Sequence, residues 1–292
     1  MSRKRRSVFL ILMAVLITTL GFTGCQSTKT EKTFRLGIIP SENAQETLKS
    51  FSPLVSYLEE SMGMKVEASV ATDYNAVVEA MRSGHIDAGM FGPFSYIMAQ
   101  ERAGAEVVLA RVGANGSPTY DSYFYTLQDS GIKEIEDLKG KSFAFTDPGS
   151  TSGYLIPSKV LLDHNITTDD FSDVIYTNGH DASILAVKNG SVNAACGDEM
   201  SYARALEKGV ITENELNVFY KASIPQSPFA VSKDIDPEIK QKFIDAMLVV
   251  HEKNPEALEP LSASKYVEVT DENYQIIRDT AEALGVDLSK MQ

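Results

Sequence analysis

The chain has 292 residues, a formal net charge of −13 and an apolar fraction of 43%. Such an acidic surface argues against binding to the phosphate backbone of nucleic acid. An anionic ligand would need a local binding site that overcomes the repulsion from the negative net charge of the whole protein. The length is large for one hydrophobic core and sufficient for two.

The first 24 residues have the pattern of an export signal. Four basic residues at positions 3–6 precede an apolar run over 8–20, which is too short to span a membrane comfortably. Removal of this segment, which carries no acidic residue, deepens the net charge from −13 to −17. We therefore expect residues 1–24 to be a signal peptide.

The segment ends in Phe22-Thr23-Gly24-Cys25, which resembles the lipobox of bacterial lipoproteins. That resemblance implies cleavage before Cys25 and attachment of lipid to its sulfur, although Phe22 departs from the usual Leu. The alternative is a plain secretory signal with an incidental cysteine. Residues 25–32 then form a flexible tether, and the protein is expected on the extracytoplasmic face of the cell membrane, in a periplasm or on the outer surface of a monoderm cell.

Cysteine usage agrees with this interpretation. Once Cys25 is acylated, Cys196 is the only thiol left, so no internal disulfide can form. Cys196 ends an apolar run over 192–196, which predicts an inert core residue.

Short apolar runs alternate with amphipathic stretches along the rest of the chain, a pattern typical of α/β proteins. In the first part, strands are expected at 34–39, 65–70, 88–91 and 107–112, with helices at 46–62, 75–82 and 94–103. In the second part, strands are expected at 142–145, 174–177 and 192–196, with helices within 151–163, 182–188 and 201–208.

Two extended stretches, 122–127 and 228–231, bracket the second set and are expected to cross between two lobes. The helices predicted near 237–251 and 271–284 then return to the first lobe. The predicted organisation is lobe 1 from 33–124 plus 226–292, and lobe 2 from 125–225.

The stretch 146–153 (TDPGSTSG) lies between a predicted strand and a predicted helix. Hydroxyl side chains followed by unpaired amides at a helix start favour an anion. The alternative is that one serine caps the helix and the rest is turn chemistry. Pro157 favours a break or a late start of that helix, so the N-cap is placed only within 150–152.

Six segments of the chain form a set that recurs in one protein family. They are 73–74 (DY), 91–93 (FGP) with Tyr96, 116–120 (GSPTY), 137–140 (DLKG), 147–157 (DPGSTSGYLIP) and 179–183 (GHDAS). In these segments, which occur in the order of the family, and over nearly all of 34–250, the chain resembles the phosphonate, phosphite and phosphate receptors of ABC importers.

This resemblance implies a type II periplasmic-binding-protein fold, in which two α/β lobes with mixed sheets are joined by two crossover strands and hold the ligand between them. It implies that Ser150, Thr151 and Ser152 grip the phosphorus oxyanion, helped by Tyr74, Tyr96 and His180. A tyrosine at a helix start more often serves packing, and His180 can equally cap its helix. The family implies a monomer that needs no cofactor. Its hinges are expected near 122–127 and 224–231, where rotation closes the lobes on the ligand. An ABC permease in the membrane is expected to recognise the closed form.

Ser227 departs from the family pattern. Relatives often have Ile-Pro-x-Asp-Pro where this chain has residues 224–228 (IPQSP). A carboxylate accepts a hydrogen bond from a protonated oxyanion, whereas a serine also donates to an unprotonated one. The change predicts weaker discrimination against dianions.

Asp198 and Glu199 follow the strand predicted to end at Cys196, where an open α/β lobe presents residues to its cleft. Relatives that take aminoalkylphosphonates pair an acid from this region with the ligand ammonium, so Asp198 is a candidate binding residue. The alternative is a solvated helix start favoured by the helix dipole.

Two other functions remain open. Ser150 or Ser152, His180 and Asp198 contain the residue types of a hydrolytic triad, but the chain has no Gly-x-Ser-x-Gly motif, no HExxH motif and only four histidines. A sensor that presents its ligand to a membrane receptor fits the same sequence as well as a transport protein does.

Overall fold

The computed structural model describes residues 32–291. The predicted signal peptide, Cys25 and most of the predicted tether lie outside the described residues. Within 32–291, no helix has the length and apolar character needed to cross a membrane.

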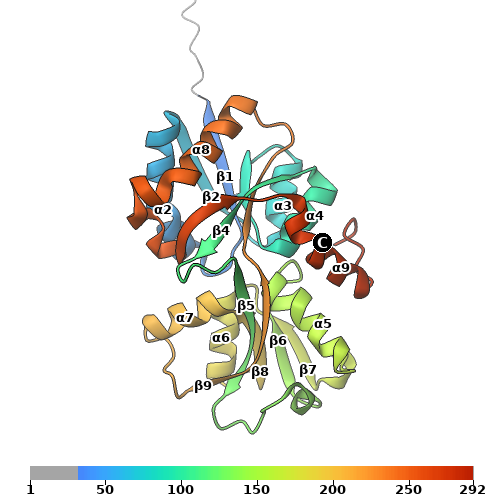
Figure 1. Ribbon diagram of the computed structural model, residues 1–292. Helices are drawn as coiled ribbons and strands as arrows, with labels where there is room; N and C mark the ends of the chain where they lie inside the picture. The colour runs from blue at the N-terminus through green and yellow to red at the C-terminus, as the bar shows by residue number, and fades with distance from the viewer. Residues whose placement is uncertain (1–31, 292) are drawn as a thin grey trace, which may run out of the picture. The chain divides into compact units, whose positions relative to one another are not determined.

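The first of two sheets has six strands in the order β11-β4-β10-β3-β1-β2 (Figure 1). Strand β1 pairs in parallel with β2 and β3, whereas β10 and β11 run antiparallel to their neighbours. The strands are β1 (Thr33–Ile38), β2 (Lys65–Val70), β3 (Ala88–Met90), β4 (Glu106–Gly113), β10 (Pro228–Val231) and β11 (Ala263–Glu268).

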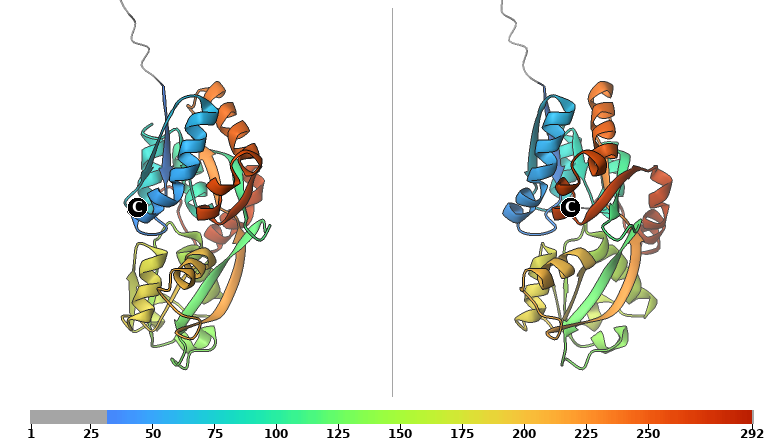
Figure 2. Two further views of the ribbon diagram at one scale, coloured as in Figure 1. Left: turned by 90° about the vertical axis from the view of Figure 1, so that its left-hand side faces the viewer. Right: turned by 60° about the vertical axis from the view of Figure 1, so that its left-hand side comes forward.

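Helices cover both faces of this sheet. Helices α2 (Ala44–Met62) and α8 (Pro237–Lys253) pack against each other over one face, as the views of Figure 2 show. The other face is covered by α3 (Tyr74–Arg82) and α4 (Pro93–Ala103), and α9 (Gln275–Ala283) packs against α4. Two separate apolar clusters fill these faces, so the sheet is packed on both sides.

The second sheet has five strands in the order β7-β6-β8-β5-β9. Strand β6 is parallel to β7 and β8, and β5 is antiparallel to β8 and β9. The strands are β5 (Thr119–Leu127), β6 (Ser142–Phe145), β7 (Asp173–Tyr176), β8 (Ala194–Asp198) and β9 (Leu216–Pro225). The helices are α5 (Ile156–Asp163), α6 (His180–Lys188) and α7 (Glu199–Glu207), and an aromatic-rich cluster packs on the α5 side.

Short 3-10 turns complete the described elements. They are Ile135–Leu138, Thr168–Asp170, Pro255–Ala257, Glu259–Leu261 and Asp271–Tyr274.

The two predicted crossover strands lie within the sheets rather than between them. Strand β5 pairs with β9 from Thr119 on, so the chain changes sheets at 114–118, ahead of the predicted boundary at residue 124. Strand β10 belongs wholly to the first sheet, and the chain returns to that sheet through Gln226 and Ser227. We call the six-stranded part lobe 1 and the five-stranded part lobe 2.

Pro157 shapes the start of α5 in the way its chemistry requires. A π-helical turn, Thr151–Leu155, precedes α5, and the Ile156 N–H donates to the Thr151 carbonyl. Pro157, which has no N–H to donate, then occupies the first turn of α5. The predicted break at this proline is therefore a change of helix type.

Candidate ligand-binding site

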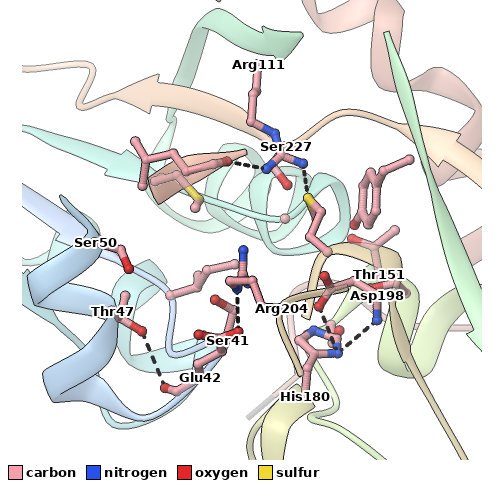
Figure 3. Close-up of a pocket in the computed structure, with 18 of the residues that line it drawn as sticks. Ser41, Glu42, Thr47, Ser50, Arg111, Thr151, His180, Asp198, Arg204 and Ser227 are labelled. Atoms are coloured by element: carbon pink, nitrogen blue, oxygen red, sulfur yellow. Dashed lines mark hydrogen bonds and ion pairs between the residues drawn. The ribbon is translucent and has the colours of Figure 1, made fainter. Parts of the chain in front are cut away.

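A cavity of about 80 Å³ lies between the lobes, where the carboxyl ends of the parallel strands of both sheets meet. A water molecule needs roughly 10–15 Å³ of such space, so there is room for a ligand of several heavy atoms. In Figure 3, one side carries Ser41, Glu42, Thr47 and Ser50 of lobe 1, and the opposite side carries Thr151, His180, Asp198 and Arg204 of lobe 2.

Three successive hydroxyls enter the cavity from the loop after β6. Ser150 is the N-cap, and its Oγ accepts a hydrogen bond from the Gly153 N–H (3.0 Å). Thr151 Oγ1 accepts from the Phe94 N–H of lobe 1 (2.8 Å). Ser152 lines the cavity beside the Tyr120 phenol. Ser150 and Thr151 accept in these bonds, so each keeps an O–H to donate, and the Tyr74 and Tyr120 phenols lie within reach of these hydroxyls.

Backbone groups add to these hydroxyls. The N–H groups of Thr151 and Ser152 open the helix, so they have no acceptor within it and lie at its positive end. The loop packs closely, because a Cβ on Gly149 would lie 2.7 Å from the Tyr74 Cβ across the lobes. The hydroxyls and backbone amides of residues 150–152 therefore lie together at the cavity wall, at a helix start whose N-cap is Ser150.

His180 links both lobes beneath this loop. Its Nε2 lies 3.3 Å from the Tyr74 hydroxyl, and its Nδ1 lies 3.2 Å from the Asp198 carboxylate. Its backbone N–H donates to the Ser41 carbonyl (2.9 Å). All three of these side chains line the cavity and are buried, and burial raises the pKa of Tyr74. Tyr74 therefore stays a neutral hydroxyl that can donate to a ligand.

Asp198 is engaged by its own lobe. It caps α7, with its carboxylate accepting from the Ser201 N–H and the Ser201 hydroxyl, both at 2.8 Å. Burial disfavours its charge, but His180, Arg204 and the Ser201 bonds outweigh burial and hold its pKa below the usual value. Glu199 does not line the cavity, which Met200 reaches instead.

The lowered pKa of Asp198 predicts how the free energy of unfolding depends on pH. A carboxyl with a lowered pKa in the folded state stabilises the fold above its unfolded pKa of about 3.9, and loses this effect as pH falls through the folded pKa. Asp198→Asn, which keeps the helix cap, should lower the free energy of unfolding at pH 7 by about 1–3 kcal/mol. The difference from the parent should shrink as pH falls from about 3.9 through the lowered pKa of Asp198, measured by urea unfolding. The exposed Asp129→Asn is the control, and an equal loss at all pH values would contradict the charge argument.

Tyr96 lies outside the cavity wall, which corrects the prediction that it binds ligand. It is buried, and its hydroxyl donates to the Asp271 carboxylate (2.6 Å), which ties α4 to the C-terminal segment. Tyr120, in β5, lines the cavity instead. Residues 116–120 were noted in the sequence, but nothing distinguished this tyrosine from a packing residue.

Ser227 lines the cavity as predicted, between β9 and β10, and its carbonyl accepts from the Arg111 N–H (3.2 Å). Sequence reasoning missed Ser41, Glu42, Arg111 and Arg204. The signals available were an arginine inside the apolar run 107–112 and polar residues directly after β1.

Contacts between the lobes close the cavity. Glu42 of lobe 1 accepts from Arg204 of lobe 2 (2.7 Å), and the Asn43 N–H donates to Asp181 (3.2 Å). Glu46 lies 3.3 Å from Lys208 at the outer edge. Within residues 32–291, no cluster of three or more His, Cys, Asp or Glu side chains is arranged to hold a metal ion.

Two α/β lobes with mixed sheets, joined by two short connections and closed over a small polar cavity, define a two-lobed solute-binding protein of the type II periplasmic class. Residues 36–274 match the family model described as "ABC transporter, phosphonate, periplasmic substrate-binding protein". The chain belongs to this family of ABC-importer substrate-binding proteins.

Curated relatives and a solved structure agree with this assignment. The chain is 35% identical over 233 residues to the phosphate-import protein PhnD of Mycolicibacterium smegmatis, covering 75% of this chain and 73% of that one. It is 31% identical over 259 residues to the phosphonates-binding periplasmic protein of Escherichia coli, covering 83% and 76%. A crystal structure of a binding-protein component of an ABC phosphonate transporter from Pseudomonas aeruginosa superposes with a TM-score of 0.81 at 27% identity, covering 86% and 85%.

Proposed function

We propose that the protein captures a phosphorus oxyanion, such as a phosphonate, phosphite or phosphate, between its lobes and delivers it to an ABC permease. The observation that carries this proposal is the hydroxyl loop Ser150-Thr151-Ser152 at a helix start inside an enclosed cavity. Hydroxyl donors and the backbone amides of the helix start converge there on one small volume, as a tetrahedral oxyanion requires. The relatives named for phosphate and phosphonates support the same ligand class.

The proposed ligand contacts come from both lobes. They are Tyr74 and Ser227 from lobe 1 and its connection, and Ser150, Thr151, Ser152 and His180 from lobe 2. Asp198 acts through His180, which it orients, rather than by direct contact. Because both lobes contribute, the ligand binds the closed form better and so shifts the equilibrium toward it.

The arrangement around His180 favours binding over hydrolysis. In the described part of the chain, neither nitrogen of His180 has a serine of the loop as its partner, because Tyr74 faces Nε2 while Asp198 and Thr146 face Nδ1. A serine nucleophile needs a base within hydrogen-bond reach. We therefore infer a receptor that returns its ligand unchanged.

The test is calorimetric titration of the chain from residue 26 onward. The panel is phosphate, phosphite, methylphosphonate, 2-aminoethylphosphonate and sulfate, with mass spectrometry of the recovered ligands. Saturable binding of a phosphorus compound that is returned unchanged supports the proposal. Absence of binding across the panel contradicts the ligand class, and a chemically altered ligand contradicts the receptor role.

We further propose that Cys25 carries the lipid that holds the protein at the extracytoplasmic face of the membrane. The support is the lipobox-like segment and the single remaining thiol, Cys196, which is buried in the core as predicted. A Cys25→Ala variant should leave the membrane fraction and lose incorporated labelled palmitate. Retention of the label in that variant would contradict the proposal.

A further inference from the structure

Arg111 is a buried cation whose hydrogen-bond partners are all neutral. It lies in β4 with 8% of its surface exposed, and its guanidinium reaches the cavity at the wall that also carries Ser227 (Figure 3). Nε and Nη2 donate to the Gln226 amide oxygen (3.0 and 2.6 Å), and Nη1 donates to the Leu261 carbonyl (2.9 Å). Nη2 also contacts the Met200 sulfur, a weak acceptor.

These bonds leave donor capacity that is aimed at the cavity. A guanidinium has five N–H groups, and three of them point at good acceptors among residues 32–291. Of the other two N–H groups, one contacts only the Met200 sulfur. An oxyanion in the cavity can accept from both of these two groups, and the planar guanidinium suits two oxygens bound to one phosphorus atom.

The other charged side chains of the cavity wall are already paired. Glu42 binds Arg204 (2.7 Å), while Asp198 binds His180 (3.2 Å) and Ser201. Within the described chain, no carboxylate lies within ion-pair distance of Arg111. Burial therefore lowers its pKa, opposed in part by the more distant Asp198. A buried charge without a counter-ion is costly, so the cavity favours a ligand that supplies one.

The same pairing leaves no site for an ammonium group. An amine on the ligand needs a free carboxylate, and both carboxylates of the wall are engaged. The residue of α7 that faces Arg111 is Met200, which offers a sulfur and a methyl group. Ile39, Phe51 and Met90 add apolar surface, which suits a small alkyl substituent.

Resting on the proposed function, we infer that Arg111 is a specificity-determining residue that selects an amine-free, dianionic phosphorus oxyanion, inorganic phosphate or a short alkylphosphonate. It does so by supplying the counter-charge from lobe 1, opposite the hydroxyl loop of lobe 2. Ser227, beside it, donates to the same unprotonated oxygens. Zwitterionic aminoalkylphosphonates are disfavoured because their ammonium would face this cation.

The test compares the parent with Arg111→Met and Arg111→Lys by calorimetric titration with phosphate, methylphosphonate and 2-aminoethylphosphonate. The pH is set below and above the second pKa of each ligand. The parent should bind methylphosphonate or phosphate at least about tenfold more tightly than 2-aminoethylphosphonate, with affinity rising as the dianion forms. Arg111→Met should lose about 10- to 100-fold for the dianions and flatten the pH dependence. It should weaken 2-aminoethylphosphonate less than it weakens the amine-free dianions, because loss of the cation also removes its repulsion of the ammonium. Arg111→Lys should fall between.

A thermal unfolding scan of the ligand-free variants separates this role from a structural one. Both variants should remain folded, and Arg111→Met should lower the melting temperature by only a few degrees, because the Gln226 oxygen and the Leu261 carbonyl lose their donor while a buried charge is removed. The inference is overturned if both variants unfold or if they bind dianions as tightly as the parent does. It is also overturned if the parent prefers 2-aminoethylphosphonate. If the parent binds none of the three compounds and does not bind phosphite either, the proposed function itself fails.

Discussion

Replacing Gly149 with alanine is expected to abolish high-affinity binding while leaving the protein folded. The added Cβ would lie 2.7 Å from the Tyr74 Cβ of lobe 1, closer than real Cβ atoms approach, and 3.2 Å from the Asp147 carboxylate of its own lobe. Tyr74 begins α3 and cannot move independently of that helix. The collision with Tyr74 lies between the two lobes, so we expect an open form, in which they are apart, to accommodate the methyl group.

The expected loss of affinity exceeds about 100-fold, because the ligand binds tightly only to a form that the methyl group disfavours. Calorimetry gives the affinity, and small-angle scattering with and without saturating ligand shows whether the compact form still appears. The ligand-free melting temperature of the variant is the internal control. Unchanged affinity would contradict the view that the ligand is held in this closed arrangement.

Ser152→Ala is expected to weaken the ligand by about 10- to 100-fold, because a hydrogen bond to a charged group contributes roughly 1.5–3 kcal/mol. Ser152 lines the cavity, and its hydroxyl neither caps the helix nor accepts the bond from Phe94. Its removal should therefore leave stability unchanged. Ser150→Ala should weaken the ligand and also cost about 1 kcal/mol of stability, because Ser150 is the N-cap.

The exposed Ser61→Ala, in α2, is the matched control for both serine variants. Titration and urea unfolding of the three proteins separate binding from folding. Equal affinity of Ser152→Ala and the parent would show that this hydroxyl does not contact the ligand.

The strands and helices near the site could be predicted from the sequence because each has apolar residues at regular spacing on its buried face. The two strands that had no counterpart in the sequence prediction, β9 and β11, are edge strands of their sheets. Both are only partly buried, so their residues lack the continuous apolar run that identifies an interior strand. The sequence also placed the first crossover between the lobes too late in the chain. Pairing of β5 with β8 and β9 decides to which sheet β5 belongs, and the local pattern of apolar residues does not show this pairing.

The sequence by itself determined the α/β class, the family and the hydroxyl loop 150–152, because apolar periodicity and a contiguous motif are local properties of the chain. Only the tertiary structure decided which distant residues share the cavity. It placed the Tyr96 hydroxyl on Asp271, paired Asp198 with His180, and brought Arg111 to the cavity wall without a counter-ion. Ion pairs in this cavity join residues that are far apart in the chain, such as Glu42 and Arg204, which are 162 positions apart. The local sequence around either residue does not predict such a pair.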